Sequence, residues 1–340
     1  MQSVRKHSSA LSQLRSVLSD LDASALLRPR APHPDTYQKM LARPVSEHHE
    51  NLVRMFRCGE RFEESRTETF LPVEVTSALE DLGIIQRDGN ILSTGEFRLV
   101  HHLGLFLFFH RVSTHAKFYY GNDSLALSRM LRPTQGNVLD LCAGPGAQAL
   151  VSAQTANSVT AVDLEQSVQR VFWINAVLNG LTEKVEFFSG DLFDPVRGRR
   201  FDRIFANPPF LPVPSEFRFP LYAGGGEDGL DIVRRILENL PEFLAENGVC
   251  QIVASALGTP EGPRLSCVEE VAHDARLDVD VSCYSFHELN ERSLPSFAAT
   301  VMNTENRERA QEAFRVHFQR LGATHIYYFV MQAKHRVGHA

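Results

Sequence analysis

The sequence predicts an α/β fold with a Rossmann-like, mostly parallel sheet, and two observations in the second half of the chain predict it. From residue 137 onward, short apolar runs typical of buried strands alternate with segments of helical periodicity. The first run, Asn137–Leu141, leads into the glycine-containing segment 142–149 and then a helix, which presents backbone N–H groups to a ligand. We therefore expect a ligand crevice at the carboxyl ends of the strands.

The alternation continues toward the end of the chain. After the first strand, a helix is expected to about residue 156, and a second strand, 158–162, leads to Asp163. Further strands are predicted at 185–189, 203–206, 248–254, 279–286 and 326–331. Further helices are predicted at 166–179, 229–240, 264–276 and 310–321. Glu227 or Asp228 is expected to cap the helix that starts at Gly229.

Residues 1–115 have a different pattern and are predicted to form an N-terminal domain, with residues 116–340 as the second domain. Apolar residues at helical spacing occur at 10–27, 35–57 and 73–82, a hairpin is expected over 84–93, and strands follow at 99–109. A helix followed by a hairpin resembles a winged-helix unit. The domain is therefore interpreted as a substrate cap or docking module, with nucleic-acid contact as the alternative. A helix from Ser124 to Leu131, capped by Asn122 or Asp123, opens the second domain.

Composition narrows the function classes. The 340 residues carry a net charge of −6, and residues 1–115 hold 14 Lys and Arg against 14 Asp and Glu, so neither part has the basic excess typical of nucleic-acid binders. No apolar run approaches the roughly 20 residues that span a bilayer, and the N-terminus lacks the apolar segment of a signal peptide. Five cysteines without Cys-x-x-Cys spacing indicate free thiols in a reducing cytoplasm and no metal site. His48-His49 is interpreted as part of a solvated helix face.

The segment Asn207-Pro208-Pro209-Phe210 directly follows a predicted strand and is expected to provide groups that bind a ligand. Its two prolines fix two φ angles and remove two N–H donors, and Pro208 keeps Asn207 out of the helical region. The carbonyl groups of this turn and the side-chain oxygen of Asn207 can therefore accept hydrogen bonds from a ligand. With the ring of Phe210 beside them, these acceptors suit a planar group that carries N–H or NH2. A strand-ending turn without function is the alternative.

Acidic residues and glycines follow the neighbouring strands. Asp163 lies roughly 20 residues after Gly144 and Gly146, where doubly wound folds hold a ribose diol. The spacing Gly144-x-Gly146-x-x-Ala149 also fits a dinucleotide-binding fingerprint. A nicotinamide cofactor is disfavoured, because Asp140 lies inside the strand where dinucleotide-binding enzymes usually have an apolar residue, and because a dehydrogenase needs no Asn-Pro-Pro-Phe segment.

These motifs together resemble the class I S-adenosylmethionine-dependent methyltransferases. The resemblance rests on Asp140-x-x-x-Gly144-x-Gly146, Asp163, Asp191 and Asn207-Pro208-Pro209-Phe210, and it covers about residues 117–255. Asn-Pro-Pro-Phe/Tyr is the signature of the branch that methylates nitrogen in protein glutamine, adenine or ribosomal guanine. The stretch Gly224–Asp231 is similar to a glycine-rich stretch of the glutamine enzymes. The family implies a seven-stranded sheet whose last strand is antiparallel.

Two departures from the family pattern leave the substrate open. Cys142 stands where the family often has glycine. Phe210 is followed by Leu211, whereas the ribosomal guanine enzymes usually have His there, and the glutamine enzymes usually have Tyr in place of the Phe.

The resemblance also implies roles for the site residues, with S-adenosylmethionine as cofactor. The residues implied to bind it are Asp140, Cys142, Gly144 and Gly146 at the methionine end, Asp163 and Leu164 at the ribose, Asp191 and Leu192 at the adenine, and Asn207. The implied catalytic residues are Asn207, Pro208 and Phe210, because Asn207 and the Pro208 carbonyl would accept hydrogen bonds from the target nitrogen. The predicted substrate-binding residues are Pro209, Phe210 and Tyr120. No metal ion or general base is required.

The predicted function is therefore methyl transfer from S-adenosylmethionine to a planar, amide or amino nitrogen. A small molecule or metabolite is the preferred acceptor, because of the acidic charge and the distinctive N-terminal domain. A protein glutamine side chain and a nucleobase of ribosomal RNA are the alternatives, suggested by the glycine-rich stretch and the winged-helix pattern respectively. A cofactor-binding module without catalytic activity is the alternative hypothesis from a different functional class. No membrane partner is expected.

Overall fold

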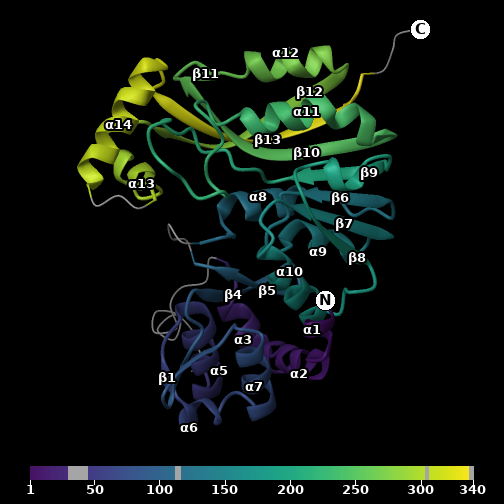
Figure 1. Ribbon diagram of the computed structural model, residues 1–340, viewed down its shortest axis with the longest axis vertical. Helices are drawn as coiled ribbons and strands as arrows, with labels where there is room; N and C mark the ends of the chain where they lie inside the picture. Colours follow the sequence, from purple (N-terminus) through teal and green to yellow (C-terminus); the bar gives the residue numbers. More distant parts are fainter. Residues whose placement is uncertain (30–44, 112–115, 303–305, 337–340) are drawn as a thin grey trace. The chain divides into compact units, whose positions relative to one another are not determined.

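The computed structural model describes residues 1–29, 45–111, 116–302 and 306–336, and the chain divides into two compact units (Figure 1). The first unit consists of residues 1–111 together with 167–183, and the second consists of residues 112–166 together with 184–340. None of the described helices is long and apolar enough to cross a membrane.

The second unit is built on one large sheet, which confirms the predicted α/β class. Its main strands are β6 (Asn137–Leu141), β7 (Ser158–Asp163), β8 (Val185–Ser189), β9 (Phe201–Ala206), β10 (Leu244–Thr259), β12 (Leu277–Glu288) and β13 (His325–His335). They lie in the order β12-β13-β10-β9-β6-β7-β8, and the two-residue strand β11 (Gly262–Pro263) pairs with β10. The last strand, β13, runs antiparallel to both of its neighbours, whereas the pairs from β10 to β8 are parallel. The seven expected strands and the antiparallel last one are therefore confirmed.

Helices pack on both faces of this sheet because its central strands are apolar on both sides. On one face, α11 (Asp231–Phe243) and α12 (Ser266–Asp274) pack against alternate residues of β10, including Ile252 and Ala254, in one buried cluster. On the other face, Leu127 of α8 (Asn122–Met130) contacts Val253, and α9 (Ala147–Ala153) follows β6. The successive residues 252, 253 and 254 thus point to alternate faces, as the pleat of a strand requires.

The chain adds its strands toward one edge of the sheet after β6 and toward the other edge from β9 onward. From β6 it continues through β7 to β8 at one side, and it then returns to β9, which lies next to β6 on the other side. The carboxyl ends of β6 and β9 are therefore adjacent at a topological switch point, where doubly wound folds bind ligands.

Three predictions about local structure in this unit need correction. The expected cap at Asn122 or Asp123 is wrong, because Gly121 is the N-cap of α8 and no side chain caps it. The helix predicted from Gly229 starts at Asp231, although Asp228 does accept a hydrogen bond from the Leu230 N–H at 2.9 Å. A short helix, α13 (Leu294–Ala298), was not expected, and it packs against α14 (Arg307–Arg320) through a cluster of phenylalanines.

The first unit combines helices with two small sheets. Its helices are α1 (Gln2–Arg5), α2 (Ser8–Leu18), α3 (Leu21–Leu26), α5 (Glu47–Val53), a π-helical turn (Arg54–Cys58), α6 (Glu64–Thr67) and α7 (Val73–Asp81). The predicted hairpin is confirmed as β2 (Gln86–Asp88) and β3 (Ile91–Ser93), and β1 (Phe62–Glu63) completes a three-stranded sheet. The helix expected over 10–27 is interrupted between Leu18 and Leu21. Residues 35–44 of the helices expected over 35–57 lie outside the described residues.

A second hairpin of this unit is hydrogen-bonded to side chains in and directly after a helix from much later in the chain. It consists of β4 (Phe97–His102) and β5 (Leu105–His110), and the helix is α10 (Val168–Leu178). Asn175 accepts from the Phe108 N–H at 2.8 Å and donates to its carbonyl at 2.9 Å, and Asn179 does the same with Phe106 at 3.0 and 2.7 Å. These two buried asparagines therefore satisfy backbone groups of β5 as a neighbouring strand would.

Candidate active site

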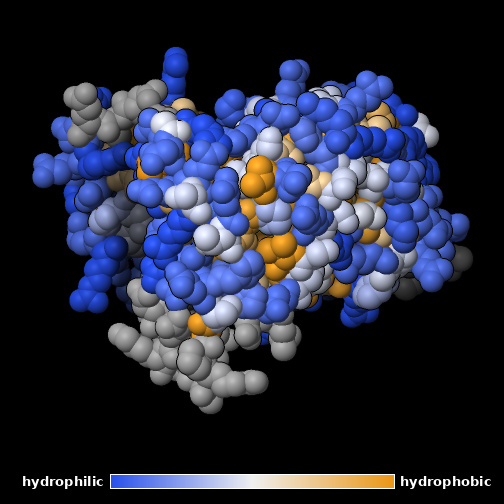
Figure 2. Space-filling view, turned by 90° about the horizontal axis from the view of Figure 1, so that it is seen from below, coloured by the Kyte–Doolittle hydropathy of each residue, from blue (hydrophilic) through white to orange (hydrophobic). Residues whose placement is uncertain are grey.

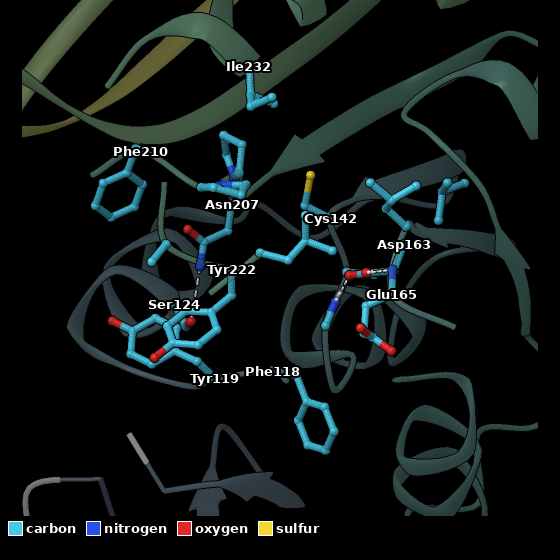
Figure 3. A pocket seen from close by; sticks show the side chains of 18 of the residues that line it. Phe118, Tyr119, Ser124, Cys142, Asp163, Glu165, Asn207, Phe210, Tyr222 and Ile232 are labelled. Atoms are coloured by element: carbon cyan, nitrogen blue, oxygen red, sulfur yellow. Dashed lines mark hydrogen bonds between the residues drawn. The ribbon is translucent and has the colours of Figure 1, made fainter. Parts of the chain in front are cut away.

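A cavity of about 340 Å³ lies in the second unit, at the carboxyl ends of β6, β7, β8 and β9. Figure 3 shows the side chains of many of the residues that line it. Of the predicted site residues, Cys142, Gly144, Asp163, Leu164, Asp191, Leu192, Asn207, Pro208, Pro209 and Phe210 line the cavity. The structure thus brings together residues that are spread over about 70 positions of the sequence.

The loop after β6 turns tightly because three of its residues have left-handed backbone conformations. The φ angles of Cys142, Gly144 and Gly146 are 56°, 53° and 90°. Glycine adopts such angles without strain, whereas a residue with a Cβ atom pays about 1–3 kcal/mol. Cys142 therefore occupies a strained position that would suit glycine better, which agrees with the glycine often found there in the family.

Asp163, at the end of β7, supports this loop. Its carboxylate accepts hydrogen bonds from the N–H groups of Gly144 at 2.8 Å and Glu165 at 2.9 Å. Burial raises the pKa of Asp163, and these hydrogen bonds oppose that rise. Each carboxylate oxygen can accept further bonds, so Asp163 remains suited to hold hydroxyl groups of a ligand.

Three of the predicted site residues do not line the cavity. Asp140 is buried beneath the loop, where one oxygen accepts from the Ala149 N–H at 2.8 Å and the other has no hydrogen-bond partner among the described residues. Burial raises the pKa of Asp140 to about 8. Gly146 is the N-cap of α9, and Tyr120 is buried while its neighbour Tyr119 lines the cavity. Tyr120 is packed into the core of the unit, whereas the three residues before it, 117–119, all line the cavity.

The segment after β8 adds an acidic and an apolar group. Asp191 accepts a hydrogen bond from Arg235 of α11 at 2.7 Å, and both residues line the cavity. Leu192 has a φ of 46°, the second strained residue in the lining. Leu192 and Ile232 belong to one hydrophobic cluster and both add apolar groups to the cavity lining. Acceptor-only carboxylates at two strand ends and an apolar surface fit the hydroxyl and amino groups and the flat ring of an adenosine.

The Asn-Pro-Pro-Phe segment forms the opposite side of the cavity in Figure 3, together with Tyr119, Ser124 and Tyr222. The side-chain nitrogen of Asn207 donates to Asp123 Oδ2 at 2.9 Å and to Ser124 Oγ at 3.1 Å. The Tyr119 hydroxyl donates to the other oxygen of Asp123, and its ring stacks on Tyr222 with 5.7 Å between the ring centroids. The nitrogen of Asn207 is thus held by a polar network in which Asp123 and Ser124 are buried.

The glycine-rich stretch lies directly against this segment. The N–H of Leu211 donates to the Ala223 carbonyl at 2.8 Å, and the N–H of Gly225 donates to the Leu211 carbonyl at 2.9 Å. A Cβ atom on Gly225 would lie 2.7 Å from the Phe210 Cα and 2.8 Å from the Pro209 oxygen, and one on Gly229 would lie 2.5 Å from the Phe210 oxygen. Because these neighbours are backbone atoms, only glycine allows the two segments to approach this closely.

The two sides of the cavity differ in the chemistry they offer. Cys142, Asp163 and Glu165 lie on one side of Figure 3, and Asn207 and Phe210 lie on the other. Two exposed leucines also line the cavity, Leu164 with 53% and Leu221 with 51% of their surface accessible. The face of the molecule in Figure 2 is mainly hydrophilic with only small hydrophobic areas. Among the described residues, no group of three or more His, Cys, Asp or Glu side chains could hold a metal ion.

Sequence reasoning missed several lining residues, including Asp123, Ser124, Tyr222 and Arg235. Asp123 and Ser124 were assigned to a helix start, and their contact with Asn207 spans more than 80 positions. Tyr222 lies shortly before the glycine-rich stretch, and this proximity is the sequence signal that could have indicated it. Arg235 lies one helical turn after Asp231 and had no distinguishing pattern.

Comparisons with known proteins agree with this geometry. The family described as "Methyltransferase small domain" matches residues 110–261. The chain is similar to a ribosomal protein uL3 glutamine methyltransferase of Bradyrhizobium diazoefficiens, with 39% identity over 39% of this chain and 46% of the relative. It is also similar to a putative protein N5-glutamine methyltransferase of Methanocaldococcus jannaschii, with 33% identity over 40% of this chain and 70% of the relative.

A third relative is a release factor glutamine methyltransferase of Thermodesulfovibrio yellowstonii, with 32% identity over 37% of this chain and 48% of the relative. The chain spans about half the length of most of the curated relatives that it matches. The region matched by the family, residues 110–261, includes the strands β6 to β9 and the loops after them that line the cavity.

Proposed function

Because the chain belongs to the class I S-adenosylmethionine-dependent methyltransferases, we propose that it methylates the side-chain amide nitrogen of a glutamine in a protein. Three relatives named as glutamine methyltransferases support this acceptor. One of them acts on ribosomal protein uL3 and one on a release factor, according to their names. A protein of the translation machinery is therefore the proposed substrate.

This proposal differs from the acceptor that the sequence analysis preferred. A small molecule or metabolite was favoured because of the acidic charge and the N-terminal domain, and none of the matched relatives cited above supports it. The protein glutamine alternative fits these relatives better. Charge and domain pattern could not reveal the acceptor, because a folded protein substrate requires no basic excess on the enzyme.

The residues of one side of the cavity suit the cofactor. Asp163 would hold the ribose hydroxyls, and Asp191 and Leu192 would hold the adenine, since the carboxylates accept hydrogen bonds and the leucine offers an apolar contact. When bound, S-adenosylmethionine supplies a methyl group that leaves with the formation of an N–C bond while the electron pair of the broken C–S bond remains on sulfur. The nitrogen then loses its proton to water.

The single observation in the site that carries the proposed transfer to a nitrogen with N–H groups is the hydrogen bonding of Asn207. Both described hydrogen bonds of its amide leave from the nitrogen, so the oxygen Oδ1 remains for the cavity. An amide NH2 of the substrate would donate to Oδ1 and to the Pro208 carbonyl, which would fix the nitrogen for in-line attack. These acceptors would also stabilise the positive charge that develops on the nitrogen in the transition state. Phe210 would pack against the plane of the substrate amide.

The test is methyl transfer from tritiated S-adenosylmethionine to purified ribosomal protein uL3 and to purified release factor. An N-methylated glutamine amide releases methylammonium on acid hydrolysis, so tritium should appear as volatile methylamine once the hydrolysate is made alkaline. The substitution Asn207→Ala should remove most turnover and leave S-adenosylhomocysteine binding nearly intact in calorimetry. Asp163→Ala should instead weaken that binding.

Two results would contradict the proposal. Turnover on ribosomal RNA alone, with a steep decline as salt rises, would identify a nucleobase as the acceptor. Unchanged turnover in Asn207→Ala would remove this residue from the catalytic site.

A further inference from the structure

The side chain of Asn207 can face the cavity in two ways. A carboxamide has nearly the same shape after a half-turn, which exchanges its oxygen with its NH2 group. Only hydrogen bonds decide which end faces the substrate. An acceptor at the cavity suits a target that carries N–H groups, whereas a donor there would oppose it.

The contacts behind Asn207 select one of these orientations. Its nitrogen lies 2.9 Å from Asp123 Oδ2 and 3.1 Å from Ser124 Oγ. Asp123 is only 5% exposed, and its other oxygen already accepts from the Tyr119 hydroxyl. Burial raises the pKa of Asp123, and the hydrogen bonds from Tyr119 and Asn207 oppose that rise. Because each of its two oxygens accepts one of these bonds, Asp123 requires the NH2 end of Asn207.

We infer that Asp123 is a positioning residue for methyl transfer, which turns the oxygen of Asn207 toward the acceptor by binding the nitrogen end of its amide. The inference rests on the proposed function, because it concerns the same target N–H groups. Asp123 acts through Asn207 and needs no contact with the substrate.

Ser124 alone would not select this orientation. A hydroxyl group can donate as well as accept, so it could bind either end of the Asn207 amide. The carboxylate of Asp123 is the group in this network that distinguishes the two ends. The Tyr119 hydroxyl holds that carboxylate in place from the opposite side.

Kinetics of Asp123→Asn tests this role, because the substitution keeps the shape and removes the distinction between donor and acceptor. We expect kcat to fall by about 100-fold or more, as when a single catalytic hydrogen bond is lost, while the KM for S-adenosylmethionine stays within about twofold. Ser124→Ala is the matched control, since it removes the other partner of the same nitrogen, and it should lose less than about tenfold. A kcat of Asp123→Asn within about fivefold of the unmodified protein would overturn the inference.

Exchanging the two groups provides a rescue experiment. In the double variant Asp123→Asn with Asn207→Asp, a carboxylate at position 207 offers acceptors to both the cavity and the amide at position 123. This variant should be at least about tenfold more active than either single variant, because Asn207→Asp alone brings two carboxylates together. Activity no higher than that of the single variants would contradict the inference. That result would instead be expected if Asp123 contacted the substrate directly.

A spectroscopic measurement separates this inference from the proposed function. In protein labelled with 15N-asparagine, the side-chain signals of Asn207 are identified by their loss in Asn207→Ala. Their hydrogen exchange with water should be at least about tenfold slower than that of an exposed asparagine, because the nitrogen is bound to Asp123. Exchange as fast as in an exposed side chain would refute the orientation. Failure of the unmodified protein to methylate any protein would refute the proposed function, and the exchange result would still decide the orientation.

Discussion

Replacing Gly225 by alanine should misplace the Asn-Pro-Pro-Phe segment. The new Cβ atom would lie 2.6 Å from the Gly229 oxygen, 2.7 Å from the Phe210 Cα and 2.8 Å from the Pro209 oxygen. Ordinary van der Waals contacts begin near 3.4 Å, so the backbone must separate by about 0.6–0.8 Å. No flexible side chain can absorb this change, because all three neighbours are backbone atoms.

The displacement is large enough to affect catalysis. A misplacement of about 1 Å at reacting groups can cost about 100-fold in rate, so a shift of 0.6–0.8 Å should lower kcat by roughly 10- to 100-fold. The assay is methyl transfer to the protein acceptor, with kcat and the KM for S-adenosylmethionine measured separately. The KM should change little, because Gly225 contacts the Phe210 side of the cavity and not the loop that contains Gly144.

Gly224→Ala is the matched control. The nearest atoms to a Cβ at Gly224 are side-chain carbons of Phe219 and Val213, both at 3.6 Å, which are normal contacts. The kcat of this variant should stay within about threefold of that of the unmodified protein. The reasoning is refuted if Gly225→Ala has normal turnover, or if both variants lose activity equally.

Three further predictions concern stability. Cys142→Gly should raise the free energy of unfolding by about 1 kcal/mol, because a residue with a φ of 56° is relieved of strain; unchanged chemical denaturation would contradict this. Asp140 has a pKa raised by burial from 3.8 to about 8, so the folded chain keeps a proton that the unfolded chain releases, and stability falls as pH rises between these values. In Asp140→Asn this decline, up to about 1.4 kcal/mol per pH unit, should be smaller, as urea unfolding at pH 5 and pH 8 would reveal. Asn175→Ala should cost about 2–4 kcal/mol, because the Phe108 N–H and carbonyl lose their partners, and the Phe108 amide should exchange faster with solvent.

The sequence allowed the central strands to be predicted closely. The bounds of β6 and β8, Asn137–Leu141 and Val185–Ser189, agree with the prediction residue for residue, because buried parallel strands are short apolar runs between turn signals. Toward the antiparallel edge the agreement declines. β10 extends over Leu244–Thr259 instead of 248–254, because Leu244 already pairs with Phe201 of β9 before an irregularity in the register, and because the residues after Ala254 continue to pair with β13. α13 is too short for helical periodicity to appear.

The cavity was predictable where a motif is local. The glycines, Asp163 and the Asn-Pro-Pro-Phe segment were found from their spacing along the chain. The polar network was not, because Asp123 and Asn207 are 84 residues apart and become neighbours only through the sheet. A sequence pattern indicates which backbone groups a nearby side chain can reach, so Asp123 was interpreted as a helix cap. Its true partner depends on the strand order.

Asn175 in α10 and Asn179 directly after it set a limit on how this chain can be recombined with other proteins. The chain passes between the two units at 111–112, 166–167 and 183–184, so no single cut separates them. A fragment that begins at residue 112 would keep Asn175 and Asn179. It would lose β5, whose backbone groups form four hydrogen bonds with these two side chains. An exchange of the N-terminal segment would therefore preserve the helix only if the incoming domain offered a strand edge with the same spacing of backbone groups.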